Sequence, residues 1–133
     1  MSGPPNAENI VSSGQGGTVE YAARANGKTE VKEWLSAQRA TIQARFGVMF
    51  DQLVKEGLPF PNASQFKKLS NDVYEFRRGG VRVFCVKHGR RWLLTNTYVK
   101  GHSKKHQMRA ADRALAIANE HHEREREKIK KGG

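Results

Sequence analysis

The spacing of hydrophobic residues is helical in the first half of the chain. From about Thr29 to Gly57, apolar residues recur every three or four positions, which predicts an amphipathic helix. Thr29 is the expected N-cap and Gly57 the expected helix end. Because glycine weakens a helix interior, Gly47 predicts a helix pair with a break near that residue. The apolar positions are Val31, Trp34, Leu35, Ile42, Phe46, Met49, Leu53 and Val54.

Hydrophobic residues alternate with polar ones in the second half, which predicts a three-stranded antiparallel meander over residues 73–99. Gly79-Gly80 and His88-Gly89 separate the strands and suit tight hairpins. With Gly79-Gly80 as a two-residue loop, Arg77 lies opposite Arg82. One face then collects an apolar set that the helix covers, with Cys85 as a small core residue: Tyr74, Phe76, Val83, Cys85, Trp92 and Leu94. The other face collects Glu75, Arg77, Arg82, Phe84, Leu93 and Thr95.

The two ends of the chain are less apolar than its middle. Residues 1–17, rich in Gly, Ser, Pro and Asn, predict a disordered leader, and residues 18–23 predict a first strand. Residues 105–128 predict a helix with a thin buried stripe, and residues 123–133 a charged C-terminal tail in solvent. The stripe comprises Met108, Ala111, Leu115 and Ala118. The predicted fold class is α+β, with an N-terminal strand and a helix or helix pair packed on a mainly antiparallel twisted sheet, and a C-terminal helix.

Composition restricts the class of protein. A chain of 133 residues suits one domain, which we place at residues 18–122. No apolar stretch approaches the roughly 18 residues that a membrane helix needs, and the N-terminus lacks the pattern of a signal peptide. A single cysteine, Cys85, cannot form an intramolecular disulfide. The sequence therefore predicts a cytoplasmic protein without contact with a membrane.

Positive charge is concentrated in one third of the chain. The formal net charge is +11, and residues 65–105 carry eleven basic but only two acidic residues. Most of this segment is predicted to be sheet, so a rigid scaffold holds the basic groups. A polyanion such as nucleic acid is the expected partner. The alternative is that the basic surface only increases solubility.

The cross-strand pair Arg77 and Arg82 is the most informative feature of the predicted sheet. Like charges directly across an antiparallel pair are destabilising. We therefore expect an anion between them, and two guanidinium groups match the geometry of a phosphate. In the alternative interpretation, Glu75 bridges one arginine and solvent screens the other.

The last strand runs directly into the segment from Tyr98 to His106, which places a phenol, two imidazoles and three ammonium groups within nine residues. Cleavage of an RNA phosphodiester without a metal needs a base for the 2′-hydroxyl, an acid for the leaving oxygen and cations for the transition state. These residue types fill all three roles. Taken singly, an exposed Lys or His in a loop is usually only solvated.

Other chemistries lack a signature in the sequence. His121-His122 is not a metal motif, because the chain has one cysteine and no acidic partner at ligand spacing. Phosphate-binding loops, dinucleotide fingerprints and nucleophile elbows are absent from the sequence as well. We therefore expect neither a metal nor a small-molecule cofactor.

Three segments together resemble the RelE/ParE superfamily of bacterial toxins, specifically its HigB-like, phage-associated branch. They are LPFPNASQFKKLSNDVYEFR, VRVFCVKHGRRWLLTNTYVKGHSKKHQ and the alanine-rich RAADRALAIANEH, and the resemblance covers about residues 18–122. The family's Lys-Lys-x-x-Lys-Thr-Pro turn is altered here, since residues 101–106 lack the Thr-Pro.

The resemblance implies the toxin of a type II toxin–antitoxin system, a ribosome-dependent endoribonuclease that cleaves mRNA without metal and is neutralised by an antitoxin protein. Arg77 and Arg82 match strand arginines that contact the scissile phosphate, Lys100 and Lys104 match basic residues after the last strand, and Tyr98 stands where the family has an aromatic residue. The expected catalytic set is Arg77, Arg82, Tyr98, Lys100, His102 and Lys104, and the expected RNA-binding set is Lys67, Lys68, Arg91, Lys105 and His106. Two alternatives stay open: a toxin of the same fold that inhibits a protein such as gyrase, and a non-catalytic phage nucleic-acid-binding protein.

Overall fold

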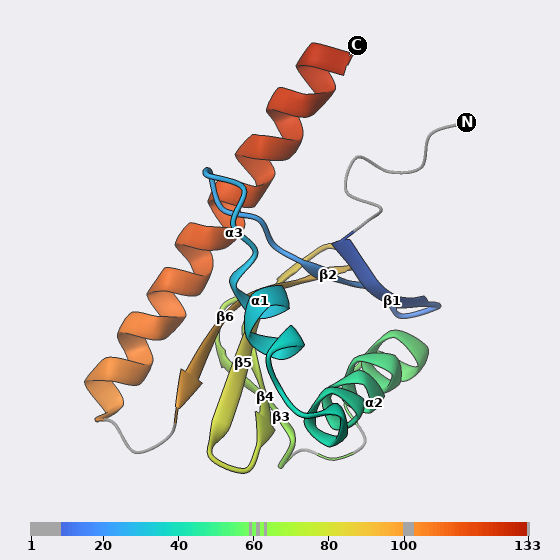
Figure 1. Ribbon diagram of the computed structural model, residues 1–133, viewed down its shortest axis with the longest axis vertical. Helices are drawn as coiled ribbons and strands as arrows, with labels where there is room; N and C mark the ends of the chain where they lie inside the picture. The colour runs from blue at the N-terminus through green and yellow to red at the C-terminus, as the bar shows by residue number, and fades with distance from the viewer. Residues whose placement is uncertain (1–8, 59, 61, 63, 100–102, 133) are drawn as a thin grey trace.

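The computed structural model describes residues 9–58, 60, 62, 64–99 and 103–132 and contains one six-stranded sheet between helices (Figure 1). In chain order the elements are β1 (Ile10–Gly14), β2 (Gly17–Tyr21), α1 (Glu30–Ser36), α2 (Ala40–Glu56), β3 (Phe66–Ser70), β4 (Val73–Arg78), β5 (Val81–His88), β6 (Arg91–Val99) and α3 (Lys104–Gly132). None of the described helices is both long and apolar enough to cross a bilayer.

The strand order is β1-β2-β6-β5-β4-β3, and every neighbouring pair is antiparallel except β2 and β6. The meander of β4, β5 and β6 is confirmed, including the pairing of Arg77 with Arg82. Gly79 has a φ of 56°, a left-handed conformation that suits its place in the two-residue turn. The α+β fold class is confirmed.

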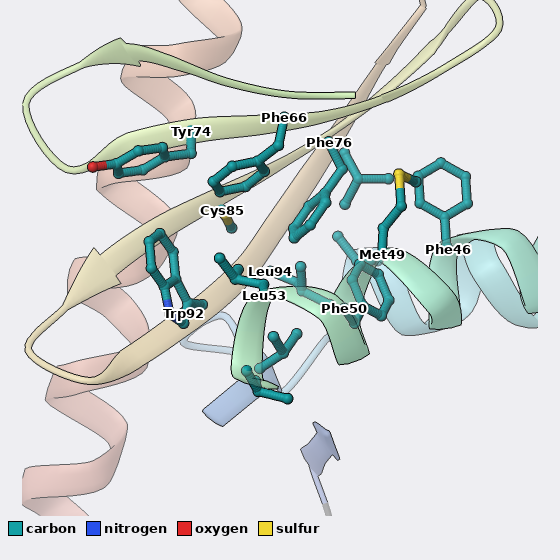
Figure 2. Close-up of a cluster of buried hydrophobic side chains, with 14 of the residues drawn as sticks. Phe46, Met49, Phe50, Leu53, Phe66, Tyr74, Phe76, Cys85, Trp92 and Leu94 are labelled. Carbon is teal, nitrogen blue, oxygen red and sulfur yellow. The ribbon is translucent and has the colours of Figure 1, made fainter. Parts of the chain in front are cut away.

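The first layer of the core lies between the sheet and the helix pair α1 and α2 (Figure 2). Phe50 of α2 meets Phe76 of β4 edge to face, with ring centroids 5.0 Å apart. All six residues predicted for this sheet face are buried, Cys85 among them. Alternation along the strands was therefore sufficient to identify the apolar face.

The second layer is formed by α3, which covers the opposite face of the sheet. Phe84 and Leu93 lie against small residues of the helix, which let its backbone approach the strands closely. Met108 and Leu115 are exposed, so the predicted stripe is wrong at both positions. The buried positions are Ala111, Ala114, Ile117, Ala118 and His121. The prediction was correct at Ala111 and Ala118, but beside them the small Ala114, not Leu115, packs against the sheet.

Helix α3 continues to Gly132, so residues 123–132 are helical and do not form a separate tail. Its last turns extend past the strands in Figure 1. Glu125 is nevertheless mostly buried, because it pairs with Arg91 at the start of β6.

The prediction of a disordered leader is wrong for Ile10–Gly14, which forms β1 and pairs with β2. Glycine is used here for close packing. The Gly16 N–H donates to the Val54 carbonyl at the end of α2, and a Cβ on Gly16 would lie 2.8 Å from the Leu53 and Val54 carbonyl oxygens. The glycine-rich composition of this segment therefore predicted disorder. In the structure, Gly16 instead allows the β1–β2 hairpin to contact α2.

The helical segment is a pair, as predicted, but the break lies at residues 37–39. Arg39 has an extended backbone and is the N-cap of α2, whereas Gly47 lies within that helix. The buried face of α2 offsets the low helix propensity of one glycine. Thr29 is the N-cap but makes no side-chain cap hydrogen bond, and Gly57 ends α2 with a φ of 66°.

Strand β3 was not predicted, because two lysines interrupt the apolar pattern of FKKLS. It forms one edge of the sheet, where Phe66 pairs with Phe76, Lys67 with Glu75 and Lys68 with Tyr74. Edge strands commonly carry lysine.

Candidate functional site

The arginine pair lies at the β4–β5 turn, and its two side chains have different environments. Arg82 is 5% exposed, and its Nη1 donates to the Gly79 and Val81 carbonyls at 2.9 and 3.2 Å. Arg77 keeps 31% of its side chain exposed. The turn therefore fixes one guanidinium group, whereas the other remains accessible to a ligand.

A pocket of about 380 Å³ opens beside this pair. It is lined by Ser64, Gln65, Arg77, Arg78, Gly79 and Arg82. Three of its six lining residues are arginines, and a backbone hydrogen bond of 2.7 Å from the Arg77 N–H to the Gln65 carbonyl joins its two walls. An anion the size of a phosphate group fits the charge and the scale of this pocket.

Glu75 supplies negative charge next to both arginines. Its Oε1 lies 3.4 Å from Arg77 Nε, and its side chain is only 1% exposed. Burial raises the pKa of the Glu75 carboxyl above its ordinary range, although Arg77 and Arg82 act in the opposite direction. The Glu75 carboxylate thus supplies part of the negative charge that we expect between the two arginines. The alternative in which Glu75 bridges one arginine is confirmed for Arg77, but Arg82 is buried against the turn and not screened by solvent.

The two lysines of β3 point to opposite faces of the sheet. Lys67 is paired with Glu75 and shares its face, whereas Lys68 Nζ lies 5.9 Å from the centre of the Tyr74 ring on the other face. Only Lys67 therefore joins the arginine pair.

Tyr98 of β6 is paired with Arg82 in register, and its ring stacks on Phe84 with a centroid distance of 6.0 Å. This strand pairing brings the phenol next to the arginine pair. Lys100 and His102, which the sequence also places in the site, lie outside the described residues.

The first turn of α3 approaches the same end of the sheet. The Ser103 hydroxyl accepts the His106 N–H at 3.3 Å, which caps the helix. The side chain of Gln107, one residue further along, approaches the Glu75 carboxylate without forming a well-aligned hydrogen bond. Lys104 and Lys105 are exposed beside them. The positive end of the helix axis therefore adds to the charge of the arginine pair.

Arg91 lies at the other end of the meander, paired with His88 next to the β5–β6 turn. Its guanidinium group donates to Glu20 at 2.8 Å and to Glu125 at 2.5 Å. Burial acts against ionisation of Glu20, but hydrogen bonds from Arg91 and Thr18 outweigh it, so the pKa of Glu20 is lowered. The structure does not bring Arg91 together with Arg77 and Arg82, and it gives this arginine two carboxylate partners.

His121 belongs to the Arg91 cluster. Its Nδ1 accepts the Ala23 N–H at 2.9 Å, and its Nε2 faces Glu125 at 3.5 Å. Donor atoms of Glu20, His121 and Glu125 lie within 4.8 Å of one another, so the fold supplies the acidic partners that the sequence spacing lacked. The Arg91 guanidinium already provides positive charge to both carboxylates.

Sequence reasoning missed Gln107 and the full burial of Glu75. Alternation placed Glu75 on the correct face, but only the docking of α3 shows that this face is covered. Helix α3 covers the sheet face that carries Phe84 and Leu93, so this face is not an open basic surface. The basic site is confined to the margin between the β4–β5 turn and the start of α3.

Comparison with known proteins gives one family. A family model described as "Phage derived protein Gp49-like (DUF891)" matches residues 33–123, which include both arginines and most of α3. No curated protein matches the chain.

Proposed function

Since the chain belongs to the family of phage-derived Gp49-like proteins, which lies within the RelE/ParE-like toxin superfamily, we propose that it is the toxin of a type II toxin–antitoxin system. Its proposed activity is ribosome-dependent cleavage of mRNA without metal, in the cytoplasm. A cognate antitoxin protein neutralises it.

The observation that carries this proposal is the pairing of Arg77 with Arg82 across β4 and β5, beside an arginine-lined pocket. In the proposed reaction the 2′-hydroxyl oxygen attacks phosphorus and the bond to the 5′ oxygen breaks. Negative charge accumulates on the phosphoryl oxygens, where two guanidinium groups stabilise it more strongly than in the ground state. Arg82 is already oriented by the turn, so little side-chain entropy is lost on binding.

Proton transfer belongs to residues at the end of β6 and after it. Tyr98 lies opposite Arg82 in the register of β5 and β6. His106 lies in the first turn of α3, at the same end of the sheet. In this proposal one of Tyr98, Lys100, His102 and His106 accepts the 2′-hydroxyl proton or supplies the proton to the leaving oxygen. Lys104 adds positive charge.

A non-nuclease toxin that inhibits a target protein is the second candidate. It is favoured by one specific observation: Arg82 is buried and already bound to two turn carbonyls, as a structural arginine would be. In that case the exposed lysines and Arg77 serve protein docking, and RNA stays intact.

Brief expression of the protein in bacteria, followed by mapping of new mRNA 5′ ends, distinguishes these functions. The comparison uses wild type, Arg77→Ala, the Arg77→Ala/Arg82→Ala double variant and Arg126→Ala, whose side chain is 63% exposed on α3. We expect cuts within translated frames for wild type and Arg126→Ala, and none for the double variant.

Two outcomes would contradict the nuclease. Growth arrest without new 5′ ends supports the inhibitor of a protein target. Absence of both arrest and cuts supports a non-catalytic nucleic-acid-binding protein, which a salt-dependent affinity for RNA would then identify.

A further inference from the structure

The Glu75 carboxylate is buried without hydrogen bonds. The residue is 0% exposed, and neither carboxylate oxygen has a hydrogen-bond partner among the described residues. Arg77 Nε, 3.4 Å away, is buried and lacks a hydrogen-bond partner as well. Buried carboxylates are normally hydrogen-bonded, because desolvation without compensation is costly. This arrangement leaves the charged form of Glu75 dependent on nearby positive charge.

Every element packed around Glu75 contributes a polar or charged group. Arg77 comes from its own strand, Arg82 from β5, Lys67 from β3 and Gln107 from α3. Tyr98 of β6 lies beside Arg82. The next residues in the first turns of α3 are exposed bases: Lys104, Lys105, His106 and Arg109. Glu75 is the acidic group among them, so any anion that enters competes with it for the same cations.

We propose that binding of a phosphodiester at Arg77 and Arg82 is coupled to the uptake of one proton from solvent by the Glu75 carboxylate. The incoming anion pairs with the two arginines whose positive charge keeps Glu75 ionised. It also adds a second negative charge next to the carboxylate. Protonation removes this repulsion. Burial already favours the neutral acid and raises the pKa of Glu75, so the anion acts in the same direction as burial. The inference rests on the anion-binding part of the proposed function and assigns Glu75 as a positioning residue that acts through the arginines.

Calorimetry with an uncleavable ligand tests the proposal. The probe is a short single-stranded 2′-O-methyl RNA, whose phosphodiesters keep their charge between pH 5 and 8 and which lacks the attacking hydroxyl. Titrations of the full chain in two buffers with different ionisation enthalpies give the number of protons bound per complex. We expect wild type to take up a measurable fraction of one proton, and its affinity to rise by at most about tenfold per unit decrease in pH.

Glu75→Gln isolates the carboxylate, because it keeps the shape of the side chain and removes its charge. We expect smaller proton uptake, a flatter dependence on pH and an affinity at pH 7.5 roughly tenfold above that of wild type. Glu20→Gln is the matched control, since Glu20 is also a buried strand carboxylate beside an arginine but lies at the other end of the meander. It should keep the proton uptake of wild type.

His102→Asn/His106→Asn, measured with Glu75 intact, is a second control and should retain the uptake. Absence of proton uptake by wild type overturns the proposal without need of a variant. Equal uptake by folded Glu75→Gln and wild type overturns it too. Proton-linked binding by a protein that produces no new mRNA 5′ ends on expression in bacteria leaves the Glu75 proposal standing and contradicts the nuclease.

Discussion

Glu75 and Arg77 lie two residues apart on β4 and point to the same face, where their charged groups approach to 3.4 Å without forming a hydrogen bond. The Glu75 carboxylate therefore offsets part of the positive charge of the site. It also explains how two arginines tolerate direct cross-strand pairing. The unliganded site is thus closer to electrical balance than its count of basic residues indicates.

Arg82→Lys tests the planar guanidinium against simple positive charge. Lysine keeps the charge but cannot present two parallel N–H donors or reproduce both hydrogen bonds to the turn carbonyls. We expect mRNA cleavage to fall by about two orders of magnitude, the scale of losing one preorganised donor. The free energy of unfolding should fall by about 1 kcal/mol. Cleavage at the wild-type rate by the lysine variant would contradict the proposed role of Arg82.

Arg91→Ala should reduce stability and leave cleavage unchanged. Removal of this arginine leaves the carboxylates of Glu20 and Glu125 facing each other. We expect a loss of about 2 kcal/mol in urea unfolding, less than for a fully buried pair because 30% of the Arg91 side chain is exposed. Arg126→Ala, which removes an exposed pair with Glu123, should change stability by less than about 0.5 kcal/mol. If the Arg91→Ala variant stayed folded but lost RNA binding, Arg91 would be an RNA-binding residue, as the sequence predicted.

Stability should fall in mild acid because of His121 and His122. Burial lowers the pKa of His121 by disfavouring the imidazolium, and the pKa of His122 is lowered by burial and then by His88. Below about pH 6.5 the unfolded chain therefore binds more protons than the folded one. The free energy of unfolding then falls as pH decreases toward the depressed folded-state values, by up to about 1.4 kcal/mol per pH unit for each histidine.

Two carboxylates titrate in other windows. The Glu20 contribution is lost only at lower pH, through its depressed folded-state pKa. Glu75 has the opposite sign, since its raised pKa favours the folded state as pH falls toward 4.5. Urea unfolding of His121→Asn/His122→Asn at pH 7.5 and 5.5 should show a flatter profile than wild type. Asparagine can still accept the Ala23 N–H at position 121. His106→Asn should keep the wild-type slope, and an unchanged slope in the double variant would contradict the assignment.

Two glycine substitutions should have opposite effects. Gly47→Ala places a Cβ in open space within α2 and should increase the free energy of unfolding by up to about 1 kcal/mol. Gly16→Ala places a Cβ 2.8 Å from two backbone carbonyl oxygens of α2 and should destabilise the protein by about 1–3 kcal/mol. Thermal unfolding of both variants checks the pair. A neutral Gly16→Ala would show that the β1–β2 hairpin does not pack on α2.

Local pattern in the sequence determined the strands of the meander, the register of β4 with β5 and the apolar face of the sheet. Side chains alternate along β4 and β5, and the Gly79-Gly80 turn allows one register, so the pairing of Arg77 with Arg82 followed from residues 73–88 alone. The amphipathic character of the helical segment and the burial of Cys85 followed from periodicity in the same way.

Only the tertiary structure decided which surfaces remain open. Burial of Glu75 requires α3 to dock over the second face of the sheet, and the partners of Arg91 come from positions 20 and 125. The break before Ala40 and the order of the glycine-rich strand β1 likewise depend on packing against distant residues. Local periodicity reports which side of an element is apolar, whereas the environment of a charge depends on residues that the chain brings together only when it folds.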